Sequence, residues 1–60
     1  MRVLLVEDDR LIRFVIASFL RVKGLSVSEA DSGEEALELL QEERFDAIVL
    51  DIDLPGISGF

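Results

Sequence analysis

Two short runs of consecutive apolar residues, at positions 3–6 and 47–50, each stop abruptly at acidic side chains. An unbroken apolar run of this length is typical of a strand that is covered on both faces, as in a parallel sheet. The pattern therefore predicts two buried strands, one over residues 2–6 and the other over residues 47–50.

A third strand is predicted over residues 25–30, where the pattern changes. Leu25 and Val27 alternate there with Ser26 and Ser28. Alternation with a period of two is expected when only one face of a strand is buried. This segment is therefore predicted as an edge strand with one exposed face.

Between the predicted strands at residues 2–6 and 25–30, apolar residues recur at helical spacing from Leu11 to Val22. Gly24 follows as a helix stop. The face expected to turn inward holds Leu11, Phe14 or Val15, Ser18 or Phe19, and Val22. The basic residues are expected on other faces or at the ends of this helix: Arg10, Arg13, Arg21 and Lys23.

A second helix is predicted to begin at Ser32, because Glu35 follows three residues later and completes a capping box. It is expected to end near Arg44. Its apolar side holds Ala36, Leu37, Leu39 and Leu40. From the two helices together, the side chains expected in the core are Phe14, Phe19, Leu37 and Leu40.

The order strand, helix, strand, helix, strand within about 50 residues implies parallel pairing through right-handed crossovers. The predicted class is α/β, in the form of half of a flavodoxin-like, doubly wound parallel sheet. Its expected strand order is 2-1-3, with the first strand in the middle.

Composition narrows the possible partners. The chain has 60 residues, no cysteine, no histidine, and a net charge of −7. So acidic a surface repels nucleic-acid phosphates and anionic membranes, and no apolar stretch approaches the roughly 20 residues that a membrane span needs. We therefore expect one small domain in the cytoplasm that binds cations rather than nucleic acid or membrane.

The acids that follow the two buried strands are the candidate chemistry. In an open α/β sheet the ligand crevice lies beyond the carboxyl ends of the strands, where the winding direction reverses. With the order 2-1-3, that crevice gathers Glu7, Asp8, Asp9, Asp51 and Asp53. Carboxylates so close repel one another unless a cation is bound, and an oxygen-only, partly hydrated site suits Mg²⁺. The alternative is that these acids are loop residues and helix caps, with Asp9 capping the first helix.

The two acidic segments resemble the response-regulator receiver family of two-component signalling. The matching stretches are residues 6–9, with the sequence Val-Glu-Asp-Asp, and residues 49–59. In the second stretch Asp51 follows an apolar run, with Pro55 and Gly59 in order behind it. The resemblance covers all 60 residues.

This resemblance implies that Asp51 is the phosphoacceptor, whose carboxylate attacks the phosphorus of a phosphohistidine on a histidine kinase or phosphotransfer protein. It also implies that Asp8 binds Mg²⁺ directly, that Glu7 acts mainly through metal-bound water, and that the backbone carbonyl of Asp53 is a further ligand. Asp9 has no ligand role in this mapping and is expected to stabilise the helix start. The chain is then a phosphoacceptor module, not an enzyme.

The family domain continues for two more strands and three more helices, so residues 1–60 are expected to be its amino-terminal half. The hydroxyl residue and the lysine that contact the phosphoryl group in the family have no counterpart here. The strand over residues 46–50 is then an open sheet edge, which is a template for pairing with another chain. We therefore expect a homo-oligomer that covers this edge; the alternative explanation for the same edge is that residues 1–60 are a fragment of a longer protein.

Three other interpretations of the sequence exist. The sequence from Asp51 to Asp53 resembles a haloacid dehalogenase type phosphatase motif, but Pro55 stands where that family has threonine or valine, and its motif lies on a first strand. The second interpretation is an EF-hand calcium loop, because Asp51, Asp53 and Gly56 fit its start. However, Pro55 replaces a ligand of that loop, and the closing glutamate is missing from this sequence. The third is a non-catalytic half-domain that assembles as a scaffold, in which Asp51→Asn leaves assembly unchanged.

Overall fold

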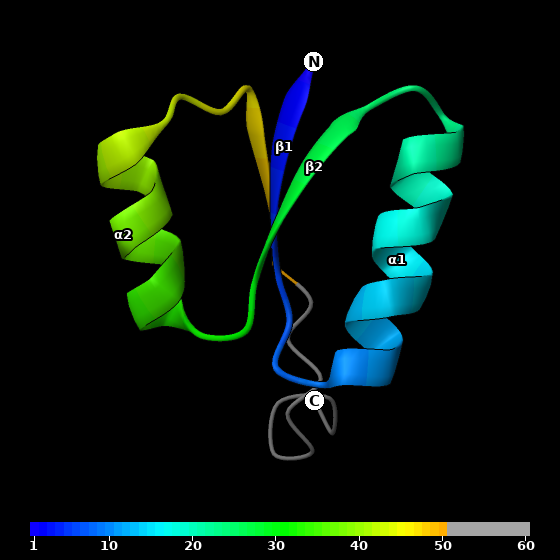
Figure 1. The fold of residues 1–60 in the computed structure, drawn as a ribbon, viewed down its shortest axis with the longest axis horizontal. Helices are drawn as coiled ribbons and strands as arrows, with labels where there is room; N and C mark the ends of the chain where they lie inside the picture. The colour runs from blue at the N-terminus through cyan, green and yellow to red at the C-terminus, as the bar shows by residue number, and fades with distance from the viewer. Residues whose placement is uncertain (51–60) are drawn as a thin grey trace, which may run out of the picture.

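The structure is a computed structural model that describes residues 1–50. Its elements, in chain order, are β1 (Arg2–Val6), α1 (Arg10–Val22), β2 (Ser26–Ala30), α2 (Gly33–Glu42) and β3 (Ala47–Leu50). The sheet forms the middle layer, with α1 on one side and α2 on the other (Figure 1). Within the described residues, no helix is long and apolar enough to cross a membrane.

The sheet has three parallel strands in the order β2-β1-β3. The register pairs the last residue of β1, Val6, with Ala30 of β2 on one side and with Leu50 of β3 on the other. Val6, Ala30 and Leu50 therefore lie level with one another, towards the carboxyl end of the sheet, where a ligand crevice is expected. The predicted class, element order and strand order are confirmed.

Local capping explains where the helices begin. Asp9 is the N-cap of α1, and its Oδ1 accepts hydrogen bonds from the backbone N–H groups of Leu11 (2.9 Å) and Ile12 (3.0 Å). Ser32 caps α2 by accepting a bond of 3.2 Å from the N–H of Glu35. The return bond of the predicted capping box is shifted by one residue, because Glu35 accepts from the N–H of Asp31 at 2.9 Å.

Gly24 ends α1 as predicted. Its φ of +89° lies in the left-handed region, which glycine adopts without a steric penalty. The Gly24 N–H donates to the carbonyl of Arg21 (2.9 Å), and the Leu25 N–H donates to that of Leu20 (3.2 Å). This is a Schellman motif, and it turns the chain into β2. Helix α2 ends at Glu42, two residues before the predicted end at Arg44.

The core lies around β1, whose Val3, Leu4 and Leu5 are all buried. Leu4 faces α2 in a cluster with Ala30 and Ala36. The side chains that pack against this cluster are Val6, Leu39 and Phe45. Because side chains alternate along a strand, Val3 and Leu5 face the opposite side of the sheet, which α1 covers. The prediction that β1 is buried on both faces is confirmed.

The outer strands differ from their predictions. Strand β3 was expected to be buried, yet Ile48 is 48% exposed and Leu50 is 61% exposed. Both helices contact only β1 and β2 among the described elements, so β3 has little to cover it. Strand β2 does lie at an edge, but Val27 and Ser28 are both half-buried, because helices cover both faces of this strand.

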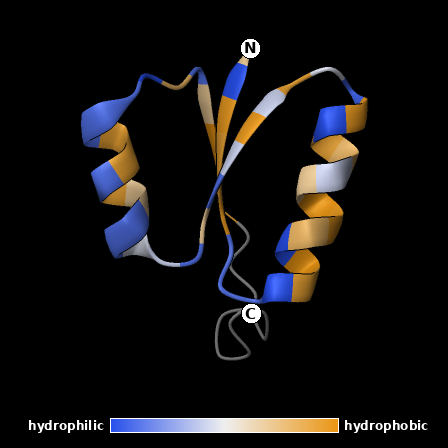
Figure 2. Ribbon diagram, in the orientation of Figure 1, coloured by the Kyte–Doolittle hydropathy of each residue, from blue (hydrophilic) through white to orange (hydrophobic). Residues whose placement is uncertain are grey.

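The inward face of α1 was predicted wrongly. Phe14 is 65% exposed, and the side that was expected to be inward is exposed along most of its length: Leu11, Phe14, Val15, Phe19 and Val22. The buried or half-buried apolar residues of α1 are Ile12, Ile16, Ala17 and Leu20. Figure 2 shows apolar residues along the whole of α1, so that periodicity alone could not distinguish the two sides.

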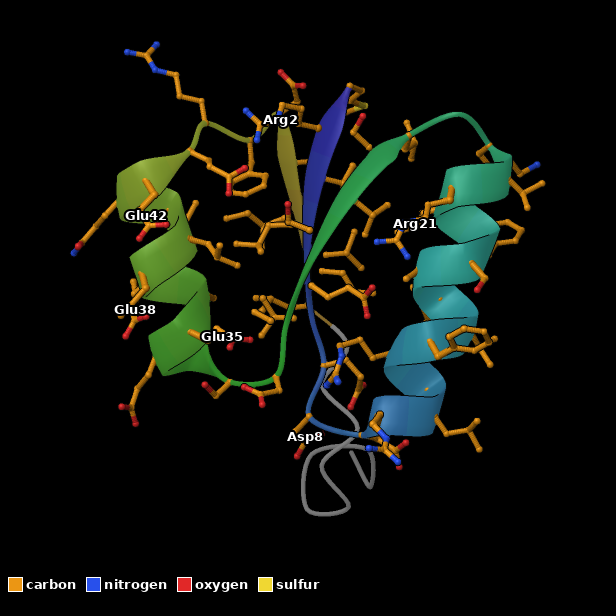
Figure 3. All side chains as sticks on the ribbon, viewed as in Figure 1. Arg2, Asp8, Arg21, Glu35, Glu38 and Glu42 are labelled. Atoms are coloured by element: carbon orange, nitrogen blue, oxygen red, sulfur yellow. The ribbon has the colours of Figure 1, made fainter. Side chains whose placement is uncertain are left out.

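The expected core residues of α2 are also exposed. Leu37 is 62% exposed and Leu40 is 39% exposed, whereas Ala36 and Leu39 turn towards the sheet. In Figure 3 Glu38 and Glu42 lie on the side of α2 that faces away from the sheet. The assignment of Phe14, Phe19, Leu37 and Leu40 to the core is therefore incorrect for the part of the chain that the structure describes.

Candidate site at the carboxyl end of the sheet

The turn between β1 and α1, which we call the acidic turn, consists of Glu7, Asp8 and Asp9. Glu7 is buried, at 2% exposure, and its N–H donates to the carbonyl of Ala30 at 3.0 Å. This bond extends the pairing of β1 with β2 by one residue beyond Val6. The Glu7 carboxylate folds back along the turn, and its Oε2 accepts a bond of 2.7 Å from the N–H of Asp9.

The three acids of this turn have different surroundings. The Asp9 side chain is used in capping α1, and its carbonyl accepts the first helical bond, from the N–H of Arg13 at 2.8 Å. Asp8 is exposed, and its carboxylate makes no hydrogen bond or ion pair with any residue between 1 and 50. It projects at the end of the sheet, beside the start of α1 (Figure 3). The expectation that Asp9 stabilises the helix start is confirmed.

Arg13 was not recognised from the sequence as part of this site. Its Nη1 donates to the carbonyl of Glu7 at 2.9 Å, and its Nε lies 3.4 Å from Oε1 of Glu29 on β2. Arg21 contacts the other oxygen of Glu29 at 3.1 Å and donates to the carbonyl of Val27 at 3.1 Å. A clue was available, because Arg13 lies three and four residues before Ile16 and Ala17 and so shares their face of the helix.

The strand ends bring together part of the predicted site. Glu7 and Asp8 do follow β1 at the carboxyl end of the sheet, and Leu50, the last residue of β3, is the register partner of Val6. Asp51 and Asp53, the other two predicted site residues, lie outside the described residues. Within residues 1–50, no group of three or more His, Cys, Asp or Glu side chains is arranged to hold a metal ion.

The described part of the site offers a buried carboxylate, Glu7, that is tied to the backbone, and an exposed one, Asp8. Oxygen donors of this kind suit a hard, partly hydrated cation such as Mg²⁺, which is commonly held by one or two carboxylates. The carboxylates of Glu7 and Asp8 alone would bind Mg²⁺ weakly. Together with further oxygen ligands, these two carboxylates fit a Mg²⁺ site.

Comparisons with known proteins identify the family of this chain. The chain matches the family model of the response regulator receiver domain over residues 3–60. It is 52% identical over 61 residues to the transcriptional activator protein ExaE of Pseudomonas putida, covering 98% of this chain and 28% of that protein. It is 53% identical over 57 residues to the transcriptional regulatory protein AfsQ1 of Streptomyces coelicolor, covering 95% and 25%.

A third relative has a different name. The chain is 44% identical over 59 residues to a cyclic di-GMP phosphodiesterase of Thermotoga maritima, covering 98% of this chain but 16% of that protein. The chain thus spans between 16% and 28% of the length of these three relatives. The match over residues 3–60, together with the parallel sheet in the order β2-β1-β3, shows that this chain belongs to the receiver domain family of the response regulators of two-component systems.

Proposed function

We propose that the chain is a phosphoacceptor module in which Asp51 receives a phosphoryl group. The observation that carries this proposal is the register of the sheet. Val6 pairs with Leu50, and each of these residues is followed directly in the sequence by an acid, Glu7 or Asp51. Because these register partners lie level on adjacent parallel strands, the acids that follow them are favoured to form a joint site.

In the proposed reaction a carboxylate oxygen of Asp51 attacks the phosphorus of a phosphorylated donor. The new O–P bond forms as the bond from phosphorus to the donor breaks, and the bonding electrons leave with the donor. The product is an aspartyl phosphate, which is an acyl phosphate. The donor is a phosphohistidine of a histidine kinase or of a phosphotransfer protein, as the family membership suggests.

Mg²⁺ is the proposed cofactor, and when bound it neutralises charge on the phosphoryl oxygens. Asp8 supports this assignment because its carboxylate is exposed and has no competing partner among residues 1–50. We assign Asp8 and Asp51 as direct ligands and the carbonyl of Asp53 as a further one. Glu7, whose Oε2 is engaged by the Asp9 N–H, acts through metal-bound water.

A cytoplasmic location and a preference for protein partners belong to the same proposal. The chain has no cysteine, which fits a reducing compartment. Its net charge of −7 opposes binding to nucleic acid through general electrostatic attraction. Relatives are named as an activator, a regulatory protein and a phosphodiesterase, and each is several times longer than the matched segment. We therefore assign a regulatory rather than an enzymatic role to residues 1–60.

The proposal is tested by incubating the chain with Mg²⁺ and a small acyl phosphate and then measuring intact mass. A gain of one phosphoryl group is expected, and it should disappear when Mg²⁺ is chelated. Asp51→Asn is the decisive variant because amide nitrogen and oxygen replace the nucleophilic carboxylate at nearly the same size. Undiminished labelling of Asp51→Asn, or no labelling of a folded wild-type chain, would contradict the proposal.

A second candidate function, self-association as a scaffold, is favoured by the exposed strand β3. Within residues 1–50, β3 pairs only with β1, so its other edge is a row of N–H and C=O groups available to another strand. Ile48 and Leu50 add exposed apolar surface beside this edge. A second copy of this chain, paired through β3, would extend the sheet and cover both side chains.

Light scattering over a concentration series tests this second function separately. Association through β3 predicts a mass that rises with concentration and that is the same in Asp51→Asn. Replacing Leu50 by Lys should lower the association, because a charge at a strand edge opposes edge-to-edge pairing. A monomer at all concentrations would exclude self-association and leave the phosphoacceptor proposal intact.

A further inference from the structure

We propose that Arg13 is a positioning residue for the acidic turn. Its guanidinium bridges the Glu7 carbonyl to the Glu29 carboxylate, and it thereby fixes the backbone from which Asp8 presents its carboxylate. This inference rests on the proposed function for its link to Mg²⁺. The structural part of it, that Arg13 orders the turn, is independent of any metal.

The Arg13 side chain lies between α1 and the sheet. Arg13 lies in the first turn of α1, where its own N–H bonds to the Asp9 carbonyl at 2.8 Å. Its side chain is only 17% exposed and is directed to the sheet side of the helix. An arginine is rarely buried to this extent without partners for its charge. The partners are Glu29 on β2 and the Glu7 carbonyl at the end of β1.

The Arg13 guanidinium contacts two acceptors through different nitrogens. Nη1 donates to the Glu7 carbonyl at 2.9 Å while Nε faces the Glu29 carboxylate at 3.4 Å, so that two different nitrogens engage the acidic turn and β2. The planar group holds its N–H donors in a fixed fork. The Arg13 side chain therefore connects α1 both to the turn that follows β1 and to β2. A lysine has one flexible ammonium group and cannot reproduce this arrangement.

The residues on both sides of Asp8 are held by hydrogen bonds, while Asp8 itself is exposed. Glu7 is held by its N–H, by its carbonyl and by its Oε2, and Asp9 is held by its cap and by its carbonyl. Asp8 lies between these two anchored residues, and its carboxylate is directed to solvent. Fixing the flanking backbone reduces the conformational entropy that Asp8 loses when it binds a cation. Residues that orient metal ligands typically change metal affinity by about 10- to 100-fold when they are mutated.

Arg21 supplies a matched control. It lies on the same helix, contacts the same Glu29 carboxylate at 3.1 Å and also donates to a backbone carbonyl at 3.1 Å. Its carbonyl partner, however, is Val27, the second residue of β2, and not a residue of the acidic turn. Figure 3 shows Arg21 reaching from α1 towards β2, well away from Asp8. Replacing either arginine removes one positive charge and one ion pair, but only Arg13 holds the turn.

The experiment compares the full chain with Arg13→Gln, Arg13→Lys and Arg21→Gln by two-dimensional amide NMR. Mg²⁺ alone is titrated, and the shifts of the Asp8 and Asp9 amides give the affinity. If Arg13 positions the acidic turn, Arg13→Gln and Arg13→Lys should weaken Mg²⁺ binding by about tenfold. The Mg²⁺ affinity of Arg21→Gln should stay within about twofold of that of the wild type. A pure charge effect predicts the opposite sign, because removing a cation near acids should strengthen Mg²⁺ binding in both Gln variants.

A second measurement needs no metal. Hydrogen exchange of the Asp9 amide, which bonds to Glu7 Oε2 at 2.7 Å, reports whether the turn is ordered. Exchange should accelerate by about fivefold in both Arg13 variants relative to Arg21→Gln, as expected for the loss of one hydrogen bond. If Arg13→Gln does not fold, Arg13→Lys, which keeps the charge, provides the comparison.

The two measurements separate the two proposals. Unchanged Asp9 exchange in folded Arg13→Lys overturns the positioning role, whatever the metal result. Accelerated exchange in a chain whose wild type binds no Mg²⁺ keeps Arg13 as the residue that orders the turn and counts against the phosphoacceptor function. Equal Mg²⁺ affinities in the Arg13 and Arg21 variants also overturn the link between Arg13 and the metal site.

Discussion

Strands β1 and β3 have almost the same pattern, a run of apolar residues followed by acids, yet they differ in burial. Leu4 in β1 and Ile48 in β3 are register partners, so their side chains lie on the same face of the sheet. Leu4 is fully buried, whereas Ile48 is 48% exposed. The difference comes from their neighbours, because β1 lies between two strands and two helices and β3 has only β1 beside it in the described part.

This comparison shows what an apolar run means. An apolar run indicates that a strand can be buried on both faces. The elements that bury it are determined by the topology of the fold. Strand β1 meets those partners within residues 1–50, and β3 does not. The same holds for the outer side of α1, where Phe14 and Val22 are exposed although they are as apolar as the residues that face the sheet. Residues 1–50 therefore leave apolar side chains of α1 and β3 uncovered.

The largest expected effect is at the centre of the sheet. Leu4→Ala should lower the free energy of unfolding by about 2–5 kcal/mol, because it removes a fully buried side chain and leaves a cavity against Ala30 and Ala36. In so small a domain this loss should populate the unfolded state. Urea unfolding followed by circular dichroism measures it, and Leu4→Met, which conserves volume, should cost less than about 1.5 kcal/mol. A loss below about 1 kcal/mol in Leu4→Ala would show that β1 is not the centre of the core.

A smaller effect is expected at the end of β1. Asp9→Ala should cost about 1 kcal/mol, because the N–H groups of Leu11 and Ile12 lose their acceptor. Asp9→Asn is the control, since asparagine is as good an N-cap and should stay close to wild type. The same urea titration gives both values. Equal losses in the two variants would mean that the charge of Asp9, and not its capping oxygen, stabilises the start of α1.

The smallest effect on stability is expected in β3. Ile48→Ala should change the free energy of unfolding by much less than Leu4→Ala, about 1 kcal/mol or less, because the Ile48 side chain is half exposed already. The measurement is made at low concentration, so that association does not contribute. A loss as large as that of Leu4→Ala would contradict the difference between the two strands and would indicate that β3 is covered in solution.

Much of this fold could be predicted from local sequence. The strands follow from unbroken apolar runs, and Gly24 and Ser32 mark a helix end and a helix start through local hydrogen bonds. The inward side of α1 could not be predicted, because apolar residues occur on several sides of this helix. Its orientation instead depends on contacts distant in sequence, such as the pairing of Arg13 and Arg21 with Glu29.

The candidate site was predictable to a similar degree. Glu7 and Asp8 could be assigned to the carboxyl end of the sheet because the strand order follows from short crossovers. The helix-start role of Asp9 was predicted from its position before α1, whereas the separate roles of Glu7 and Asp8 could not be assigned from residue type, since both are carboxylates. The hydrogen bonds distinguish them, with Asp9 used in capping and Glu7 folded onto the turn. Arg13 was missed because a basic residue on a helix is usually solvated.

The central claim, that Asp51 accepts the phosphoryl group, is tested most directly by locating the acyl phosphate. Borohydride reduces an aspartyl phosphate to homoserine, which peptide mass spectrometry can assign to one position in the chain. After incubation with Mg²⁺ and a small acyl phosphate, the account predicts homoserine at position 51 and at no other acid. Homoserine at position 8, 9 or 53, or its absence from a chain that is folded and binds Mg²⁺, would contradict it.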